Sequence, residues 1–159
     1  LVVRDTGKYF YPRMLEAYRE VFAELGLACD DRSLAVMEDD YELGAYLCGR
    51  KILARPELPS AIIVSRDYQA CGINQACVEK GLIPGKDISL IGYDDIGWRG
   101  GHDILTTYAE PCEELGRGAV DVLHSILAGD GGPLQREVIP KLVLRRTLCP
   151  IPPETPPKR

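Results

Sequence analysis

The sequence predicts an α/β protein with an open, mostly parallel, doubly wound sheet flanked by helices. Two short apolar runs at 61–64 and 88–91 bracket a helical stretch at 67–80, and a strand, helix, strand order of this length is typical of a βαβ unit with parallel strands. Short apolar runs alternate with helical stretches in the preceding part of the chain as well. We therefore expect four parallel strands and three helices before residue 92.

The first strand, at 1–3, leads to a helix that runs from Pro12 to about residue 25, because proline suits the first helical position. Apolar side chains recur along this helix with a period of 3.6 residues, which indicates that one face is turned to the core. Gly26 is expected to end the helix in a left-handed conformation. The apolar positions are Met14, Leu15, Tyr18, Val21, Phe22 and Leu25.

The next two units repeat this pattern. A strand at 33–37 precedes a helix at 41–54. In the third unit, Asp67 is expected to be the N-cap of the helix at 67–80, and Gly81 its left-handed C-cap.

The alternation changes after the fourth strand. A glycine-rich loop at 97–102 leads to a short extended piece at 105–108 and to a fourth helix at 111–127. One or two further strands are expected within 137–148. The tail at 150–159 contains five prolines and is predicted to be disordered.

The composition excludes several classes of protein. Hydrophobic residues make up 45% of the 159 residues and charged residues 27%, as in an ordinary soluble domain, and no apolar run approaches the roughly 20 residues that cross a bilayer. The net charge is −5, with no Lys/Arg cluster, so a nucleic-acid-binding surface would have to lie on another segment. Six cysteines without a C-x-x-C motif favour a reducing cytoplasm and no metal site, and we predict no cofactor. They are Cys29, Cys48, Cys71, Cys77, Cys112 and Cys149.

Polar residues follow two of the predicted strands. Ser65-Arg66-Asp67 comes after the first, and Gly92-Tyr93-Asp94-Asp95 after the second. Ligands of open parallel sheets bind outside the carboxyl ends of the strands. The sequence therefore predicts a small-molecule site that contains Arg66, Asp67, Asp94 and Asp95.

Four motifs resemble the effector-binding core of the lactose/galactose repressor family of bacterial transcription regulators. Residues 59–67 are similar to the family's P-T-A-x-x-x-x-N-D, and residues 81–95 to its G-L-x-V-P-x-D-I-S-V-x-G-Y-D-D. Leu105-Thr106-Thr107, Glu110-Pro111 and Leu115-Gly116 resemble L-T-T-x-x-Q-P-x-x-x-L-G, and residues 142–147 resemble L-x-x-R-x-S/T.

The resemblance implies a fold like that of periplasmic binding proteins and a chain that is part of a two-subdomain core. Residues 1–108 and 133–149 would form the C-terminal effector-binding subdomain. Residues 109–132 would form a crossing helix that packs on the first subdomain, outside this chain. Without that cover we expect the fragment to dimerise or to reorder the helix, whose apolar face comprises Leu115, Ala119, Val122, Leu123 and Ile126.

The resemblance also implies ligand contacts. Asp94 matches an aspartate that accepts hydrogen bonds from a sugar or nucleobase, although a carboxylate here could instead only cap the next turn. Tyr41 matches an aromatic residue that stacks on the ligand ring, although it could instead pack on its own domain.

Three positions depart from the family pattern. Where the family has an arginine this chain has Met14, and Arg13 stands one residue earlier, about 100° around the helix. Arg66 replaces the asparagine of N-D, so a cation with donors only stands in place of a neutral amide. Glu110 replaces a glutamine. Arg66 and Glu110 could pair across the cleft, Arg66 could bind an acidic group of the ligand, or both could be solvated charges.

By the same resemblance, the subunit interface of a homodimer would include Cys71, Gln75, Trp98 and His102. The implied function is the ligand-sensing and dimerisation portion of a cytoplasmic bacterial regulator. A small polar, sugar-like effector would bind in the cleft, and operator DNA would bind a separate N-terminal domain; no membrane partner is expected.

Two other functions remain open. A periplasmic sugar-binding transport protein shares the fold, but it would need a signal peptide and would have little use for six unpaired cysteines. A doubly wound enzyme domain is disfavoured because G-x-S-x-G, G-x-G-x-x-G and G-x-x-x-x-G-K-[ST] are all missing from the sequence. Asp94 and Asp95 are also adjacent, so they would point apart rather than act as an acid/base pair.

Overall fold

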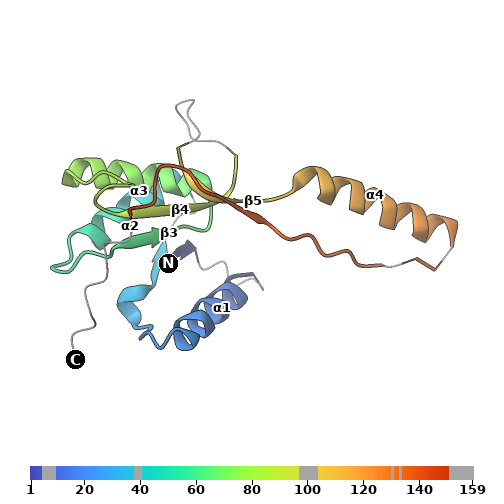
Figure 1. Cartoon of the computed structure of the whole chain (residues 1–159), viewed down its shortest axis with the longest axis horizontal. Helices are drawn as coiled ribbons and strands as arrows, with labels where there is room; N and C mark the ends of the chain where they lie inside the picture. The colour runs from blue at the N-terminus through green and yellow to red at the C-terminus, as the bar shows by residue number, and fades with distance from the viewer. Residues whose placement is uncertain (5–9, 38–40, 97–103, 130, 133, 151–159) are drawn as a thin grey trace.

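The computed structural model describes residues 1–4, 10–37, 41–96, 104–129, 131–132 and 134–150. It confirms the open, mostly parallel α/β sheet with helices on both sides (Figure 1). In chain order the strands are β1 (Val2–Arg4), β2 (Ala35–Met37), β3 (Ala61–Ile63), β4 (Ser89–Asp94), β5 (Thr106–Ala109) and β6 (Lys141–Val143).

The strand order explains why the carboxyl ends of the strands gather at one edge. β1 pairs with β2, and β3, β4, β5 and β6 pair in that order. A parallel bridge between Val2 and Val64 joins the two groups, which gives the order β2-β1-β3-β4-β5-β6. Only β6 runs antiparallel to its neighbour. The extended piece predicted at 105–108 is therefore a fifth parallel strand.

The hydrophobic core lies between the sheet and two helices, α2 (Glu42–Leu53) and α3 (Asp67–Lys80). These helices pack closely because small residues face each other: a Cβ on Gly72 would collide with the carbonyl oxygen of Glu42. Gly81 ends α3 with φ +77°, as predicted. Large buried side chains of this core include Leu53, Ile62, Val64, Ile73, Ile88 and Leu90.

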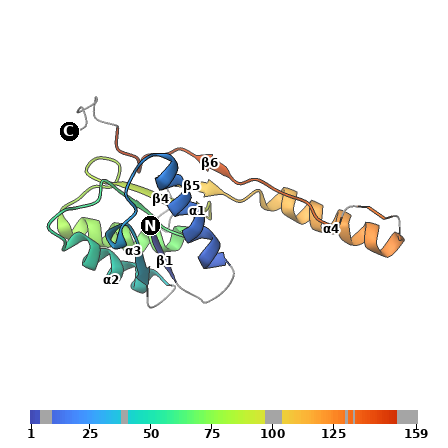
Figure 2. The ribbon, with the colours of Figure 1, turned by 90° about the horizontal axis from the view of Figure 1, so that it is seen from below.

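Helix α1 (Phe10–Glu24) covers the opposite side of the sheet less completely (Figure 2). It begins two residues before Pro12, and Gly26 follows its end with φ +66°, the left-handed conformation that was predicted. None of its described side chains belongs to the buried core, and Val21 is exposed, as is Leu25 just after the helix. The predicted apolar stripe therefore exists, but it is only partly covered by the sheet.

Helix α4 (Cys112–Ala128) projects away from the sheet, and the chain returns along it to β6 (Figure 1). Only Gly118 is buried among its residues, beneath the side chain of Arg136. An ion pair of 3.0 Å between Arg136 Nη1 and Asp121 Oδ2 also holds the returning segment to the helix. Among the described residues, no helix combines the length and apolarity that crossing a membrane requires.

Candidate functional site at the strand tips

Three predicted ligand residues stand at the carboxyl ends of neighbouring strands. Arg66 lies shortly after β3, Asp94 ends β4, and Glu110 follows β5. The strands are in parallel register, with Ile63 opposite Ile91 and Asp94 opposite Ala109. Segments that are far apart in sequence thus meet at one edge of the sheet. We call Arg66, Tyr93, Asp94 and Glu110 the strand-tip cluster.

The closest contact in this cluster is an ion pair of 2.8 Å between Arg66 Nη1 and Asp94 Oδ1. The Asp94 side chain is only 10% exposed, whereas the Arg66 side chain is 45% exposed. Burial raises the pKa of Asp94; the guanidinium opposes this rise, and the charges of Asp67 and Glu110 add to it. Three alternatives were open for Arg66, and pairing with Asp94 was not among them. Asp94 lies next to Arg66 because β4 lies between β3 and β5.

Glu110 and Tyr93 form the other half of the cluster. Burial raises the pKa of Tyr93, and a hydrogen bond from its hydroxyl to the Glu110 carboxylate raises it further. Glu110 also attracts the Arg66 guanidinium. Tyr93 was not predicted as a site residue, although its place beside Asp94 on the same strand could have suggested one.

The backbone at the end of β4 has an unusual conformation. Asp94 has φ +116° and Asp95 φ +61°, values that residues other than glycine rarely adopt. Such conformations cluster at functional sites and persist only where neighbouring contacts hold them. Here Arg145 Nη1 lies 2.6 Å from Asp95 Oδ1 and donates to the carbonyl oxygen of Leu105 at 3.0 Å. Asp95 is thus a structural carboxylate of the tip.

Asp67 has a different role from the one predicted. Arg66 occupies the N-cap position of α3, and the Asp67 side chain is buried. It accepts hydrogen bonds from Thr107 Oγ1 at 2.6 Å and from the amide of Ile96 at 3.1 Å. Burial raises the pKa of Asp67, and these hydrogen bonds oppose the rise. The N-cap prediction failed because the carboxylate turns towards β5 rather than towards its own helix.

The remaining predicted residues are dispersed. Tyr41 is at the N-cap position of α2 and is 71% exposed, and Arg13 is exposed on α1. They follow β2 and β1, on the other side of β3 from the cluster, so their role in ligand binding stays a prediction. Cys71 is half-buried and Gln75 exposed on α3. The other two interface positions, Trp98 and His102, lie outside the described residues.

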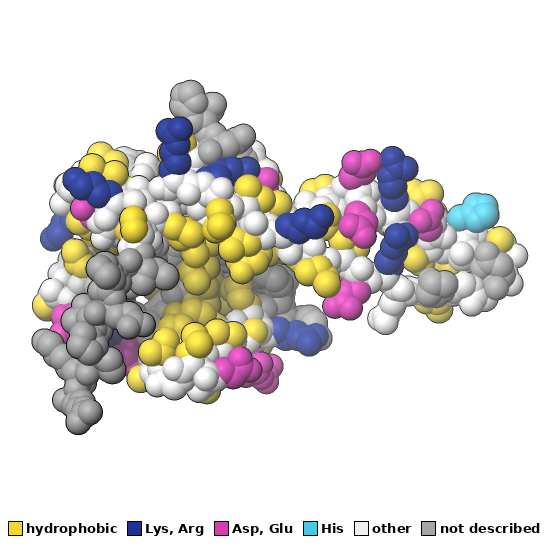
Figure 3. All heavy atoms as spheres, in the orientation of Figure 1, with side chains coloured by type: hydrophobic (Ala, Val, Ile, Leu, Met, Phe, Trp, Pro, Cys, Tyr) yellow, Lys and Arg dark blue, Asp and Glu magenta, His cyan; other side chains and the backbone are white. Residues whose placement is uncertain are grey.

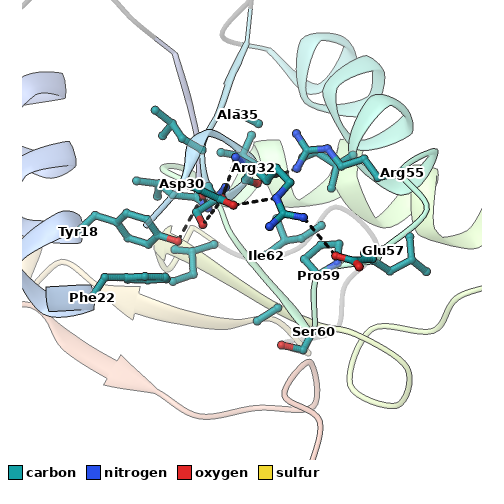
Figure 4. Close-up of a pocket in the computed structure, with 18 of the residues that line it drawn as sticks. Tyr18, Phe22, Asp30, Arg32, Ala35, Arg55, Glu57, Pro59, Ser60 and Ile62 are labelled. Carbon is teal, nitrogen blue, oxygen red and sulfur yellow. Dashed lines mark hydrogen bonds and ion pairs between the residues drawn. The ribbon is translucent and has the colours of Figure 1, made fainter. Parts of the chain in front are cut away.

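A groove of about 1030 Å³ lies elsewhere, between α1 and the sheet (Figure 4). Apolar side chains gather along this hollow (Figure 3), including Tyr18 and Phe22 from α1. Its polar rim contains ion pairs from Arg32 to Asp30 at 2.8 Å and to Glu57 at 3.2 Å. The groove contains none of the predicted ligand residues and lies near the amino ends of the strands. We therefore regard the strand-tip cluster, and not this groove, as the candidate site.

A family model described as a periplasmic binding protein-like domain matches residues 1–148. The transcriptional repressor PurR of Haemophilus influenzae (strain PittEE) is 37% identical over 116 residues, which cover 70% of this chain and 33% of that protein. The ribose operon repressor of Escherichia coli (strain K12) is 34% identical over 110 residues, which cover 69% of this chain and 33% of that protein. The chain thus spans about a third of the length of these curated relatives.

Solved structures show the same fold. A LacI family regulator from Bifidobacterium animalis subsp. lactis superposes with a TM-score of 0.83 at 21% identity, covering 94% of this chain and 54% of that one. The Escherichia coli transcriptional repressor ascG superposes with a TM-score of 0.81 at 22% identity. The similarity covers 94% of this chain and 55% of that one. Both similarities extend over nearly all of this chain but over only about half of each neighbour.

Proposed function

Because the chain belongs to the periplasmic binding protein-like family, as the C-terminal effector-binding domain of a LacI-type regulator, we propose that it senses a small polar, sugar-like effector and dimerises. The whole protein would be a bacterial regulator that binds operator DNA through a separate N-terminal domain and acts in the cytoplasm. It would regulate transcription and would not be an enzyme, as is the case for the repressors it resembles.

The observation that carries this proposal is the convergence of Arg66, Asp94 and Glu110 at the tips of three adjacent parallel strands. Carboxylates accept hydrogen bonds from ligand hydroxyls, and a guanidinium donates to ligand oxygens. Hydrogen bonds to charged groups contribute about 1.5–3 kcal/mol each. A polyol can use both kinds of partner at once, which suits a sugar-like ligand.

The proposed cleft needs a second side. Since the chain covers about half of its structural neighbours, we propose that another subdomain faces the strand tips and that α4 packs on it. Ligand binding would close the two subdomains and change how the dimer presents its DNA-binding heads. Cys71 and Gln75 on α3, with Trp98 and His102, would lie in the dimer interface.

Asp94→Ala in the full-length gene product tests this function. Thermal shifts would be measured with a panel of monosaccharides, sugar acids and nucleosides, and with operator release as a second measurement. We expect the variant to lose the ligand-induced shift, with affinity weakened about 10- to 100-fold, as expected for losing hydrogen bonds to a charged group.

The matched control is Glu57→Ala, which removes a carboxylate paired with Arg32 at the groove, away from the strand tips. This control should keep the wild-type response. An unchanged ligand shift in Asp94→Ala would refute the assignment of the site.

A further inference from the structure

We propose that the effector is a sugar acid, and that Arg66 selects it by binding its carboxylate. This inference rests on the proposed function and adds to it the chemical class of the ligand. It depends on which group of the strand-tip cluster a ligand meets first.

The exposed group of the cluster is a cation. Arg66 is 45% exposed, whereas Asp94, its partner, is 10% exposed and so lies largely covered. Glu110 is half-buried and accepts a hydrogen bond from Tyr93. A ligand that enters from the solvent side therefore meets the guanidinium before either carboxylate.

Arg66 has more hydrogen-bond donors than its contact with Asp94 uses. A guanidinium carries five N–H donors, and among the described residues the guanidinium of Arg66 donates a hydrogen bond to Asp94 alone. The donors left over lie in a planar fork, which matches the two oxygens of a carboxylate. Any hydrogen bond from a guanidinium is charge-assisted, and a ligand carboxylate adds a direct attraction between opposite charges that a neutral hydroxyl lacks.

Besides its proposed contact with ligand hydroxyls, Asp94 positions the guanidinium. Its carboxylate holds one edge of the guanidinium at 2.8 Å, and the end of β4 is itself held by the ion pair between Asp95 and Arg145. A guanidinium fixed in this way loses less side-chain entropy when a ligand binds, because part of its freedom has already been given up.

The carboxylates next to Arg66 limit which kind of anionic ligand group it can bind well. Asp94 and Glu110 bring two negative charges close to Arg66, so a phosphate with nearly two charges would be repelled more strongly than a singly charged carboxylate. Glu110 can accept hydroxyl donors from the rest of the ligand. A polyol with one carboxylate, such as an aldonic or uronic acid, satisfies both conditions.

The test compares matched ligands on the full-length protein by calorimetry. D-glucuronate, D-galacturonate and D-gluconate represent the acids, D-glucose and D-galactose the neutral sugars, and D-glucose 6-phosphate the alternative anion. We expect at least one acid to bind about 10-fold or more tightly than its neutral counterpart and than the phosphate. Arg66→Gln should remove this preference, and Arg66→Asn should shift it towards neutral sugars.

Arg32→Gln is the matched control, because Arg32 also pairs with an aspartate but lies at the groove, and it should leave the preference unchanged. Neutral sugars that bind as tightly as the acids, or a preference that survives in Arg66→Gln, would overturn this inference. If neutral sugars bind and Asp94→Ala abolishes that binding, the proposed function still stands; if no ligand of any series binds, both fail. Tighter binding of the phosphate would overturn the choice of carboxylate.

Discussion

At the scale of single residues, the strand tips depend on a close fit between Asp67 and Gly92. A Cβ on Gly92 would collide with Oδ1 of Asp67. The same carboxylate oxygen accepts the hydrogen bond from Thr107, so it cannot move away without losing that partner. A glycine at the centre of β4 therefore has a packing reason, and the glycine in the G-Y-D-D motif is needed to seat the buried aspartate.

Gly92→Ala is expected to destabilise the protein by about 1–3 kcal/mol, the usual cost of overpacking a buried site. Urea unfolding followed by circular dichroism would measure it. Gly116→Ala is the control, because nothing lies within 4 Å of a Cβ there, and replacing an interior helical glycine stabilises by up to about 1 kcal/mol. Equal stability of Gly92→Ala and wild type would show that this fit is not needed.

Local sequence signals predicted backbone features better than side-chain partners. Gly26 and Gly81 adopt the predicted left-handed conformations because a missing Cβ acts on the glycine's own backbone. The role of Asp67 was predicted wrongly, and the pairing of Arg66 with Asp94 was not among the alternatives for that residue. In both cases the partner comes from a neighbouring strand rather than from adjacent residues. The strand-tip cluster was predictable as a location, but its internal pairing was not.

At the scale of elements, the βα alternation was predicted through β4, and the later part was predicted only in outline. β5 joins the sheet in parallel, and the single strand β6 lies antiparallel at its edge. Sequence pattern identifies an extended segment, but the neighbour it pairs with depends on the whole sheet. The apolar stripe of α1 shows the same limit. The 3.6-residue period of its apolar side chains was predicted, but the fact that the sheet covers them only partly was not.

Helix α4 carries a bare apolar face, in which Leu115, Leu123 and Ile126 are exposed. We expect the 159-residue chain alone to associate as its concentration rises, because burying this face removes apolar surface from water. Light scattering should show that Leu123→Glu reduces the association.

Ile83→Glu, an exposed apolar position in the link between α3 and β4, serves as the control for that helix and should have little effect. A wild-type chain that stays monomeric over the same concentration range would contradict the expectation for α4.

At the scale of the whole molecule, the two sides of the sheet are unequally packed. The buried core lies with α2 and α3, while α1 leaves a groove of about 1030 Å³ beside the sheet. Stability therefore depends mainly on one layer of helices, and the titration of buried groups near that layer should be visible in the unfolding of the whole chain.

Asp94 gives such a pH dependence. Burial raises its pKa in the folded state, so between about pH 4, its ordinary range, and the raised value the folded chain binds more protons than the unfolded one. Stability contributed by this group is then greatest at low pH and falls as the pH rises through that window.

Asn does not titrate, so the unfolding free energy of wild type minus that of Asp94→Asn should decrease with rising pH and then level off. Urea unfolding between pH 4 and 7 measures this difference. A difference that stays constant across the range would show that burial does not shift the Asp94 carboxyl.

The point where α4 leaves the sheet lies beside the strand-tip cluster. Glu110 lies only two residues before the helix begins at Cys112, and the chain re-enters the sheet at β6, the neighbour of β5. The projecting arm is thus hinged on two adjacent strands, beside a carboxylate of the cluster. We therefore expect a change in the angle of the arm to alter the position of Glu110, and a ligand held by Glu110 to influence that angle in turn.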